Sequence, residues 1–356
     1  MEEKKIYTML CKPVTEGLGL CNQLCLVANA IENAFQVFSL GKGTIYVPDV
    51  EKFVYGGKEY SSTSIEGFHR VGLSLWGEDP LPWVTKNLIV HWKQRTRLPT
   101  SCYTDFDGLN WIQTIPDEIH IILCDFVLNI NDPDTLPLNC VLDLDAINSV
   151  FAPFRIKLVP YSNQNAYYSL FEFYNMNTPR YSSLFHFIVN SLRFQPHYHE
   201  YIDNYSLNLK KEKISVVHLR TEWDVSHLAT YEMQINRDYF YNQLHQKFID
   251  NIKKHIDPEI SDVIVLTYEP ENNKVLEWMT ENNYTYHLIE KPENVKHQRE
   301  VSGIYDLIAS GLCNDVFIGA FDIHSFEGTS TFSYFIYCML KNKDVTTVGI
   351  NIKKIA

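Results

Sequence analysis

From residue 212 onward, short β-branched and apolar runs alternate with longer stretches in which apolar residues recur at helical spacing. Strands are predicted at ISVVHLR (214–220), DVIVLT (262–267), TYHLIE (285–290) and DVFIG (315–319), and helices at about 237–256, 272–280, 300–311 and 331–341. Strands that alternate with helices favour a parallel sheet covered by helices on both faces. The pattern therefore places this part of the chain in the α/β class.

The N-terminal half repeats this pattern less regularly. Strands are predicted at 6–11, TIYVP (44–48), 119–124 and 155–160, and helices from the GLGL turn to Gly41 and at 181–194, with an irregular insert at about 50–118. A chain of 356 residues is long enough for two domains. We predict Rossmann-like domains at 1–198 and 212–356, joined by a polar linker at about 199–211. Their parallel sheets would face each other across a cleft at the carboxyl ends of the strands, where open α/β sheets bind ligands.

The composition excludes several classes of partner. The chain has 31 basic and 43 acidic residues, a net charge of −12, so a nonspecific nucleic-acid surface is not expected. No stretch approaches the roughly 20 apolar residues of a transmembrane helix. The N-terminal MEEKKIYTML lacks the apolar core of a signal peptide, and the eight scattered cysteines suit reduced thiols. These features predict a cytoplasmic protein.

The strongest chemical motif is VVHLRTEWD, residues 216–224. A buried strand delivers His218, Arg220, Glu222 and Asp224 at its carboxyl end, on alternating positions. An arginine there suits a diphosphate, because its guanidinium donates paired, charge-assisted hydrogen bonds and stays protonated. The alternative is a structural ion pair between Arg220 and one of the two acids.

A second motif is DVFIG followed by GTSTFS, residues 315–319 and 328–333. A strand ends at Gly319, and Thr329, Ser330 and Thr331 offer hydroxyls to the start of the last long helix. Free N–H groups and the positive end of the helix dipole make such a site attractive to anions. The simpler alternative is a helix cap that binds no ligand.

The third motif, GLGLCNQL at 17–24, opens the first long helix. It places an uncharged amide, Asn22, directly after the glycines. Asn22 is either a ligand-binding amide at a helix mouth or a helix cap.

Together, GLCNQL, NSLRFQPHYHEYI (190–202), VVHLRTEWD and DVFIG…GTSTFS resemble, in their order, the GDP-fucose-dependent fucosyltransferase superfamily, which includes the protein O-fucosyltransferases and their α1,2/α1,6 relatives. The resemblance covers most of the chain except 50–118 and 125–175. It implies a GT-B architecture, with the acceptor mainly on the first domain and the nucleotide sugar mainly on the second. It also implies inverting transfer of a sugar, with fucose from GDP-fucose as the favoured donor, and with no metal and no cofactor beyond the donor. The expected cytoplasmic setting favours a hydroxyl of a glycan or glycoconjugate as the acceptor.

The resemblance also assigns roles to single residues. Arg220 would bind the diphosphate, with His218 beside it. Ser330, Thr331 and Phe332 would hold phosphate and base. Gly19 and Asn22, in the first loop, would face the donor sugar and its β-phosphate.

Two departures from the family pattern concern acidic residues. After the second strand of the C-terminal domain the family often has an Ala-Thr-Asp-like step, whereas this chain has Thr267, Tyr268 and Glu269. Glu16 resembles the general base of one branch, although its spacing to Asn22 is longer than in that branch. Glu222 and Asp224 are rival candidates for the base.

Several other readings are open. A metal-dependent GT-A transferase would need an Asp-x-Asp motif, and the chain has three: Asp105/Asp107, Asp132/Asp134 and Asp143/Asp145. A zinc site at His197, His199 and Glu200 lacks further ligands at familiar spacing. An NAD-dependent enzyme is disfavoured, because GLGLCNQ lacks the third glycine of G-x-G-x-x-G. The donor could be another nucleotide sugar, such as a UDP-pentose, and the chain could be a noncatalytic sugar-nucleotide or glycan-binding module.

Overall fold

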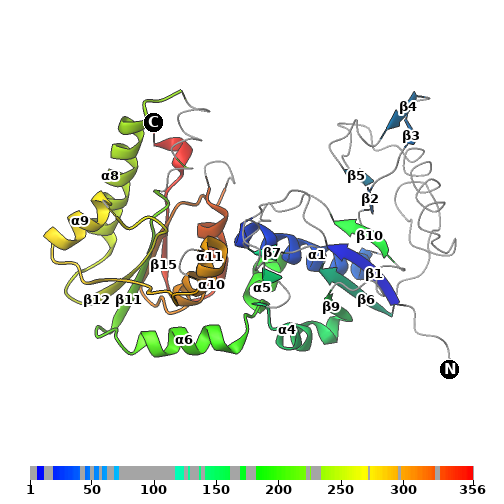
Figure 1. Cartoon of the computed structure of the whole chain (residues 1–356), viewed down its shortest axis with the longest axis horizontal. Helices are drawn as coiled ribbons and strands as arrows, with labels where there is room; N and C mark the ends of the chain where they lie inside the picture. Colours follow the sequence, from blue (N-terminus) through cyan, green and yellow to red (C-terminus); the bar gives the residue numbers. More distant parts are fainter. Residues whose placement is uncertain are drawn as a thin grey trace. The chain divides into compact units, whose positions relative to one another are not determined.

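A computed structural model of the chain shows two compact units, each an α/β structure (Figure 1). The structure describes residues 6–11, 19–40, 45–48, 52–55, 58–61, 68–71, 117–123, 127–128, 136–137, 141–160, 169–173, 182–221, 225, 234–271, 273–295, 298–324 and 329–355. The first unit contains Met1–Leu18, Gln23–Arg180 and Ser191–Arg193. The second contains Gly19–Asn22, Tyr181–Asn190 and Phe194–Ala356.

The first unit is built on a four-stranded parallel sheet in the order β10-β1-β6-β9. Its strands are β1 (Ile6–Cys11), β6 (Glu118–Leu123), β9 (Ile156–Pro160) and β10 (Ser169–Phe173), and its helices are most of α1 (Leu20–Leu40), α4 (Leu144–Phe151) and the short η3 (Ala152–Phe154). Antiparallel pairs are formed by β2 (Ile45–Pro48) with β5 (Phe68–Val71), β3 (Lys52–Tyr55) with β4 (Lys58–Ser61), and β7 (Val127–Leu128) with β8 (Leu136–Pro137). The inner face of α1 is fully buried at Leu24, Val27, Ala28 and Ile31, as its spacing predicts.

The second unit contains a five-stranded parallel sheet in the order β13-β12-β11-β14-β15. The strands are β11 (Lys213–His218), β12 (Ser261–Leu266), β13 (Tyr286–Leu288), β14 (Val316–Gly319) and β15 (Thr346–Gly349). The helices are α5 (Ser183–Ser191), α6 (Pro196–Ser206), α8 (Arg237–His255), α9 (Lys274–Glu281), α10 (Arg299–Ser310), α11 (Thr331–Leu340) and the short η5 (Ile352–Lys354).

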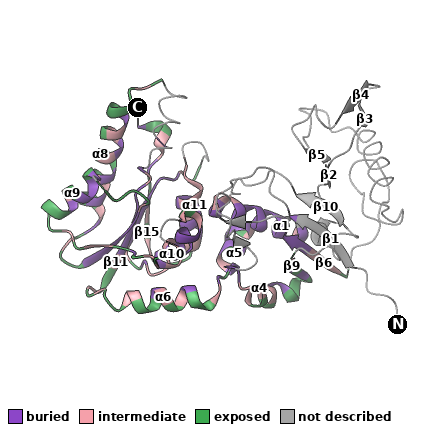
Figure 2. Ribbon diagram, in the orientation of Figure 1, coloured by how far each residue is buried: buried purple, intermediate pink, exposed green. Residues whose placement is uncertain are grey.

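Alternation along the central strands divides the core of the second unit into two layers. Val217, Val265 and Ile318 pack with buried residues of α8 and α9. Because neighbouring residues of a strand point to opposite faces, Val216 and His218 face the other side, where α10 and α11 lie. β12 and β14 are buried throughout and β11 over its last four residues, as Figure 2 shows, whereas the edge strands β13 and β15 are partly exposed. The prediction of a parallel sheet covered by helices is confirmed.

The predicted elements of the C-terminal half all appear, with ends that differ by a few residues. The structure adds β15 and α4, which the sequence analysis did not propose. It also shows a helix, α6, across most of the predicted linker at 199–211. This helix begins at Pro196, whose fixed φ suits a first helical turn, and Tyr198 and Tyr201 pack edge-on against Tyr305 of α10. A stretch that is polar in sequence is thus tied to the second unit by its tyrosines.

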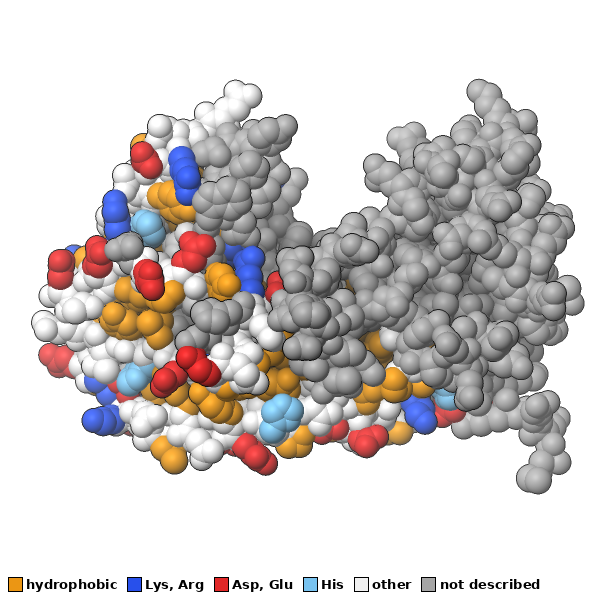
Figure 3. Space-filling model, viewed as in Figure 1, with side chains coloured by type: hydrophobic (Ala, Val, Ile, Leu, Met, Phe, Trp, Pro, Cys, Tyr) orange, Lys and Arg blue, Asp and Glu red, His pale blue; other side chains and the backbone are white. Residues whose placement is uncertain are grey.

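The described surface carries mixed charge. On the face in Figure 3, Lys and Arg side chains of the described residues are interspersed with Asp and Glu. Cys11, Cys21, Cys25, Cys313 and Cys338 are buried thiols without disulfides. Among the helices that the structure describes, none has the length and apolar character needed to span a bilayer.

Candidate functional site

The candidate site lies where the chain reverses its direction across the second sheet. From the central β11 the chain moves outward through β12 and β13, then crosses to β14 on the other side of β11. Ligands of open α/β sheets bind at such a switch point, at the carboxyl ends of the strands. Here those ends carry His218 and Arg220 after β11, and Gly319 and Ala320 after β14.

Ser333 connects the two strand ends through one hydroxyl. Its Oγ accepts a hydrogen bond from the Ala320 N–H at 2.9 Å and lies 2.5 Å from His218 Nδ1. A hydroxyl oxygen can accept two hydrogen bonds and donate one, so while Ser333 Oγ accepts from Ala320 it can either donate to His218 Nδ1 or accept from it. In either tautomer the contact holds the His218 ring beside the end of β14.

The first turn of α11 is held close to these strand ends. Ser330 is the N-cap, with its Oγ accepting from the Ser333 N–H at 3.5 Å, and its own N–H donates to the Ala320 carbonyl at 2.7 Å. The predicted cap is confirmed. Phe332 lies over His218, with ring centroids 4.9 Å apart. The amino end of α11, which attracts anions, is therefore fixed beside the end of β11.

Two guanidinium groups add positive charge here. The pKa of His218 is lowered to about 3, first by burial and then by the fields of Arg220 and Arg299. Arg220 is half-buried after β11, and Arg299 opens α10, with its Cζ 5.7 Å from the centre of the Tyr268 ring. Two guanidinium charges and a helix amino end near a neutral histidine suit a diphosphate.

The first turn of α1 belongs to the same unit. Gly19 and Asn22 are half-buried, and Leu20 between them is buried. A Cβ added to Gly303 of α10 would lie 3.3 Å from Phe332 Cε2 and 3.6 Å from Leu20 Cδ2. The start of α1 and Phe332 therefore meet at one glycine of α10.

A cavity of about 610 Å³ lies next to this arrangement, at the carboxyl ends of β12 and β13. Its lining includes Thr267, Tyr268, Lys291, Ser302 and Asp306. The Thr267 hydroxyl is buried and finds no hydrogen-bond partner among the described residues, while Lys291 and Asp306 form a largely buried ion pair. The lining mixes apolar residues such as Leu288, Ile289 and Pro292 with polar and charged ones, including Glu290 and Glu293.

The structure thus brings most of the predicted site residues together and leaves others apart. His218, Ser330, Thr331 and Phe332 surround the switch point, and Thr267 lines the neighbouring cavity. Glu269 is exposed and is not part of the cavity lining. Glu16, Glu222 and Asp224, the three candidate bases, lie outside the described residues.

Of the three Asp-x-Asp pairs that could bind a metal ion, the structure describes Asp143 and Asp145. Asp143 is the N-cap of α4 and accepts the Ala146 N–H at 3.0 Å, while Asp145 is exposed in the first turn. Asp105, Asp107, Asp132 and Asp134 lie outside the described residues. Within the described ranges, no group of three or more His, Cys, Asp or Glu side chains, the α6 histidines included, is placed to bind a metal ion.

Three features of the site were missed from the sequence. Arg299 and Ser333 come to His218 from helices far along the chain. Thr221, after β11, accepts a hydrogen bond at 3.0 Å from Asn273, which also caps α9. Asn273 could have been recognised as a helix cap, but its contact with Thr221 depends on the tertiary fold.

The lowered pKa of His218 predicts that acid destabilises the protein. Below the unfolded pKa of 6.5, the unfolded chain binds a proton that the folded chain does not take up until about pH 3, so stability is present above pH 6.5 and is lost as the pH falls. We expect His218 to contribute about 2 kcal/mol of the loss in unfolding free energy between pH 6.5 and 4.5. Urea unfolding of the wild type and His218→Asn at both pH values measures this share.

His186 and His245, whose pKa values are each lowered to about 4 chiefly by burial, serve as internal references, because their contributions remain in the variant. His218→Asn should therefore lose part of the acid sensitivity, not all of it. Equal losses in the wild type and the variant would contradict the assignment.

No protein-family model matches the chain, and no curated protein matches it. Among solved structures, the chain is similar to POFUT1 in its apo form, at 11% identity and a TM-score of 0.42, over 98% of this chain and 99% of that one. POFUT1 in complex with GDP-fucose matches at 9% identity, a TM-score of 0.42 and the same coverage.

The α-1,6-fucosyltransferase NodZ soaked with GDP-fucose matches at 11% identity and a TM-score of 0.36, over 95% of this chain and 93% of that one. NodZ from Bradyrhizobium also matches, at 11% identity and a TM-score of 0.33, over 94% and 92%. The chain is similar to fucosyltransferases, the class that its sequence motifs resemble.

Proposed function

We propose that the protein is a metal-independent, inverting glycosyltransferase that moves fucose from GDP-fucose to a hydroxyl of a glycan or glycoconjugate. The observation that carries the proposal is the arrangement around His218. A neutral, hydrogen-bonded histidine, two arginines and the amino end of α11 form one positive site at the switch point. Its charge suits a nucleoside diphosphate, and the motifs behind the chain's resemblance to fucosyltransferases include His218, Arg220 and the start of α11, though not Arg299.

The site would act chiefly on the leaving group. As the bond between the sugar C1 and the β-phosphate oxygen breaks, negative charge grows on the diphosphate. Arg220 and the free N–H groups of α11 are donors whose positions are fixed before the reaction, and such donors stabilise charge at little reorganisation cost. Stabilisation of the departing diphosphate would be the main contribution of this unit.

The acceptor hydroxyl would attack C1 from the opposite face, with inversion, and its proton would pass to a base. Glu16 stays our candidate for that base, with Glu222 and Asp224 as rivals. In this scheme the fucosylated acceptor and GDP are the two products. A carboxylate can accept the proton near neutral pH if its surroundings raise its pKa.

The 610 Å³ cavity is our proposed place for the nucleoside. It adjoins the positive site, because Arg299 lies over Tyr268 of the cavity lining. The unpartnered Thr267 hydroxyl offers a hydrogen bond to a base, and Leu288, Ile289 and Pro292 offer apolar walls.

Binding of GDP and GDP-fucose, measured by thermal shift and calorimetry against UDP and UDP-sugars, tests the donor. We expect the guanosine ligands to stabilise the fold by about 2.7 kcal/mol at 100 times Kd and the uridine ligands to have little effect. Release of GDP in the presence of a glycan acceptor library then tests turnover.

Other outcomes would redirect the proposal. A preference for UDP-sugars would indicate a transferase with a different donor, and tight binding of GDP-fucose without turnover would indicate a noncatalytic module. Failure of every nucleotide to bind would contradict the proposal. The cytoplasmic location expected from the sequence stays a prediction.

A further inference from the structure

Asp322, three residues after β14, is the centre of a hydrogen-bonded cluster in the loop that leads to α11. Its Oδ2 accepts from Asn351 Nδ2 at 2.8 Å and from Lys354 Nζ at 3.0 Å, and its Oδ1 accepts the His324 N–H at 2.9 Å. Its own N–H donates to Thr329 Oγ1 at 3.1 Å. The partners come from both ends of the loop and from the segment after β15.

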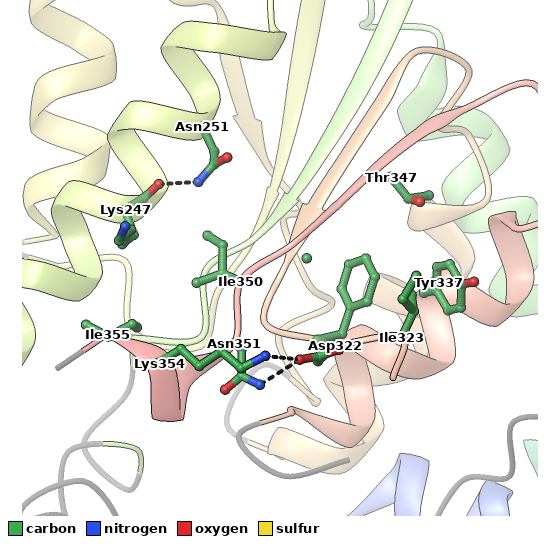
Figure 4. Close-up of a pocket in the computed structure, with 12 residues that line it drawn as sticks. Lys247, Asn251, Asp322, Ile323, Tyr337, Thr347, Ile350, Asn351, Lys354 and Ile355 are labelled. Atoms are coloured by element: carbon green, nitrogen blue, oxygen red, sulfur yellow. Dashed lines mark hydrogen bonds and ion pairs between the residues drawn. The ribbon is translucent and has the colours of Figure 1, made fainter. Parts of the chain in front are cut away.

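Figure 4 shows this cluster at one wall of a cavity of about 480 Å³, where Asn351 and Lys354 converge on Asp322. The side chain of Asp322 is largely enclosed, at 11% exposure, although Lys354 is 73% exposed. Hydrogen bonds from the Asn351 amide, the His324 backbone N–H and the Lys354 ammonium lower the pKa of Asp322 below its ordinary value, so the carboxylate is charged at neutral pH. A charged acceptor makes these hydrogen bonds stronger than neutral ones.

The loop between β14 and α11 is therefore fixed at two levels. Close to the strands, Ala320 donates to Ser333 and accepts from Ser330. Further out, Asp322 holds Thr329, the residue directly before the N-cap, and ties it to the segment after β15. Between them, these contacts fix both ends of the loop that presents the first turn of α11.

We propose that Asp322 and Asn351 are positioning residues for the anion site at α11: they touch no substrate, and they hold Thr329 to Thr331 in the geometry that binds the donor diphosphate. This inference rests on the proposed function and deepens it. The supporting contacts of a preorganised site are as necessary to its geometry as the groups that touch the ligand. The C-terminal segment 350–355 would thus be part of the donor site's support.

The experiment compares two carboxylates that flank the same strand. Asp315, directly before β14, likewise accepts three hydrogen bonds, all from side chains (Lys213, Ser215 and Ser261), but at the opposite end of the sheet. Asp322→Asn, Asn351→Ala and the control Asp315→Asn are compared by GDP calorimetry and by thermal unfolding. Amide hydrogen exchange of the peptide covering 329–336 reports on the α11 mouth whether or not GDP binds.

We expect Asp322→Asn and Asn351→Ala to weaken GDP binding by at least about ten-fold and to speed exchange at 329–336. Asp315→Asn should lower the unfolding temperature and leave both readouts unchanged. Removal of a negative charge by itself favours an anion, so weaker GDP binding by Asp322→Asn separates positioning from electrostatics.

Each result decides one claim. Unchanged exchange in both cluster variants would overturn the inference, even if the wild type binds no GDP and the proposed function has failed. Faster exchange with unchanged GDP affinity would overturn the link to the donor site. If Asp315→Asn weakens GDP binding as much as the two cluster variants do, the weaker binding reflects general destabilisation of the fold. That result would also overturn the inference.

Discussion

Replacing Arg220 with alanine is expected to lower the rate of GDP release from GDP-fucose by at least about 100-fold, which corresponds to roughly 3 kcal/mol of transition-state stabilisation. Arg220 lies one residue past the pairing of Leu219 with Leu266, close enough for its charge to lower the pKa of His218. Because diphosphate charge grows as the sugar leaves, the loss should be larger in kcat than in KM. Steady-state kinetics with varied GDP-fucose measures both.

Two further variants make this result specific. Arg220→Lys keeps the charge but loses the paired geometry of the guanidinium, so we expect it to recover only part of the rate. Arg237→Ala is the matched control, because this exposed arginine opens α8 and lies over the ring of Tyr241, outside the site. Full activity in Arg220→Ala, or an equal loss in Arg237→Ala, would remove Arg220 from the proposed chemistry.

The architecture of the second unit could be predicted from the sequence because its signals are local. The strand VVHLR is apolar through Val217 and Leu219, and burial on both faces follows from its place at the centre of a parallel sheet. The Ser330 cap could also be predicted, because capping depends on residues three apart. Short-range patterns therefore predicted the elements and one side of the site.

The rest of the site depends on contacts that no short-range pattern records. His218 and Ser333 are 115 residues apart, and Asp322 meets Asn351 across 29 residues. An aspartate in a loop and an asparagine near the C-terminus are ordinary surface residues until the fold brings them together. The sequence thus predicted Arg220 and His218, but neither the second arginine, Arg299, nor the contact of His218 with Ser333.

A second large effect is expected where β14 and β15 end, because a loop packs closely against Gly349. Gly319 and Gly349 are paired neighbours and end their strands, and the loop after β14 turns back over Gly349. A Cβ at position 349 would lie 2.3 Å from the Phe321 carbonyl oxygen, a backbone atom next to Asp322. We expect Gly349→Ala to lower the unfolding free energy by about 3 kcal/mol, because the loop must move as a whole. Urea unfolding measures this loss.

A second glycine shows why the neighbouring atom decides the cost. A Cβ on Gly303, in the middle of α10, would meet only side-chain atoms of Phe332 and Leu20 at 3.3 and 3.6 Å. Alanine favours a helix over glycine by about 1 kcal/mol, and the tight contact with Phe332 opposes that gain. The two effects partly cancel, so Gly303→Ala should change the unfolding free energy by less than about 1 kcal/mol. Gly349→Ala should in addition weaken GDP binding at temperatures where the protein stays folded, because the displaced Phe321 carries the Asp322 cluster with it. A stable Gly349→Ala protein with unchanged GDP affinity would show that the loop can shift without moving the mouth of α11.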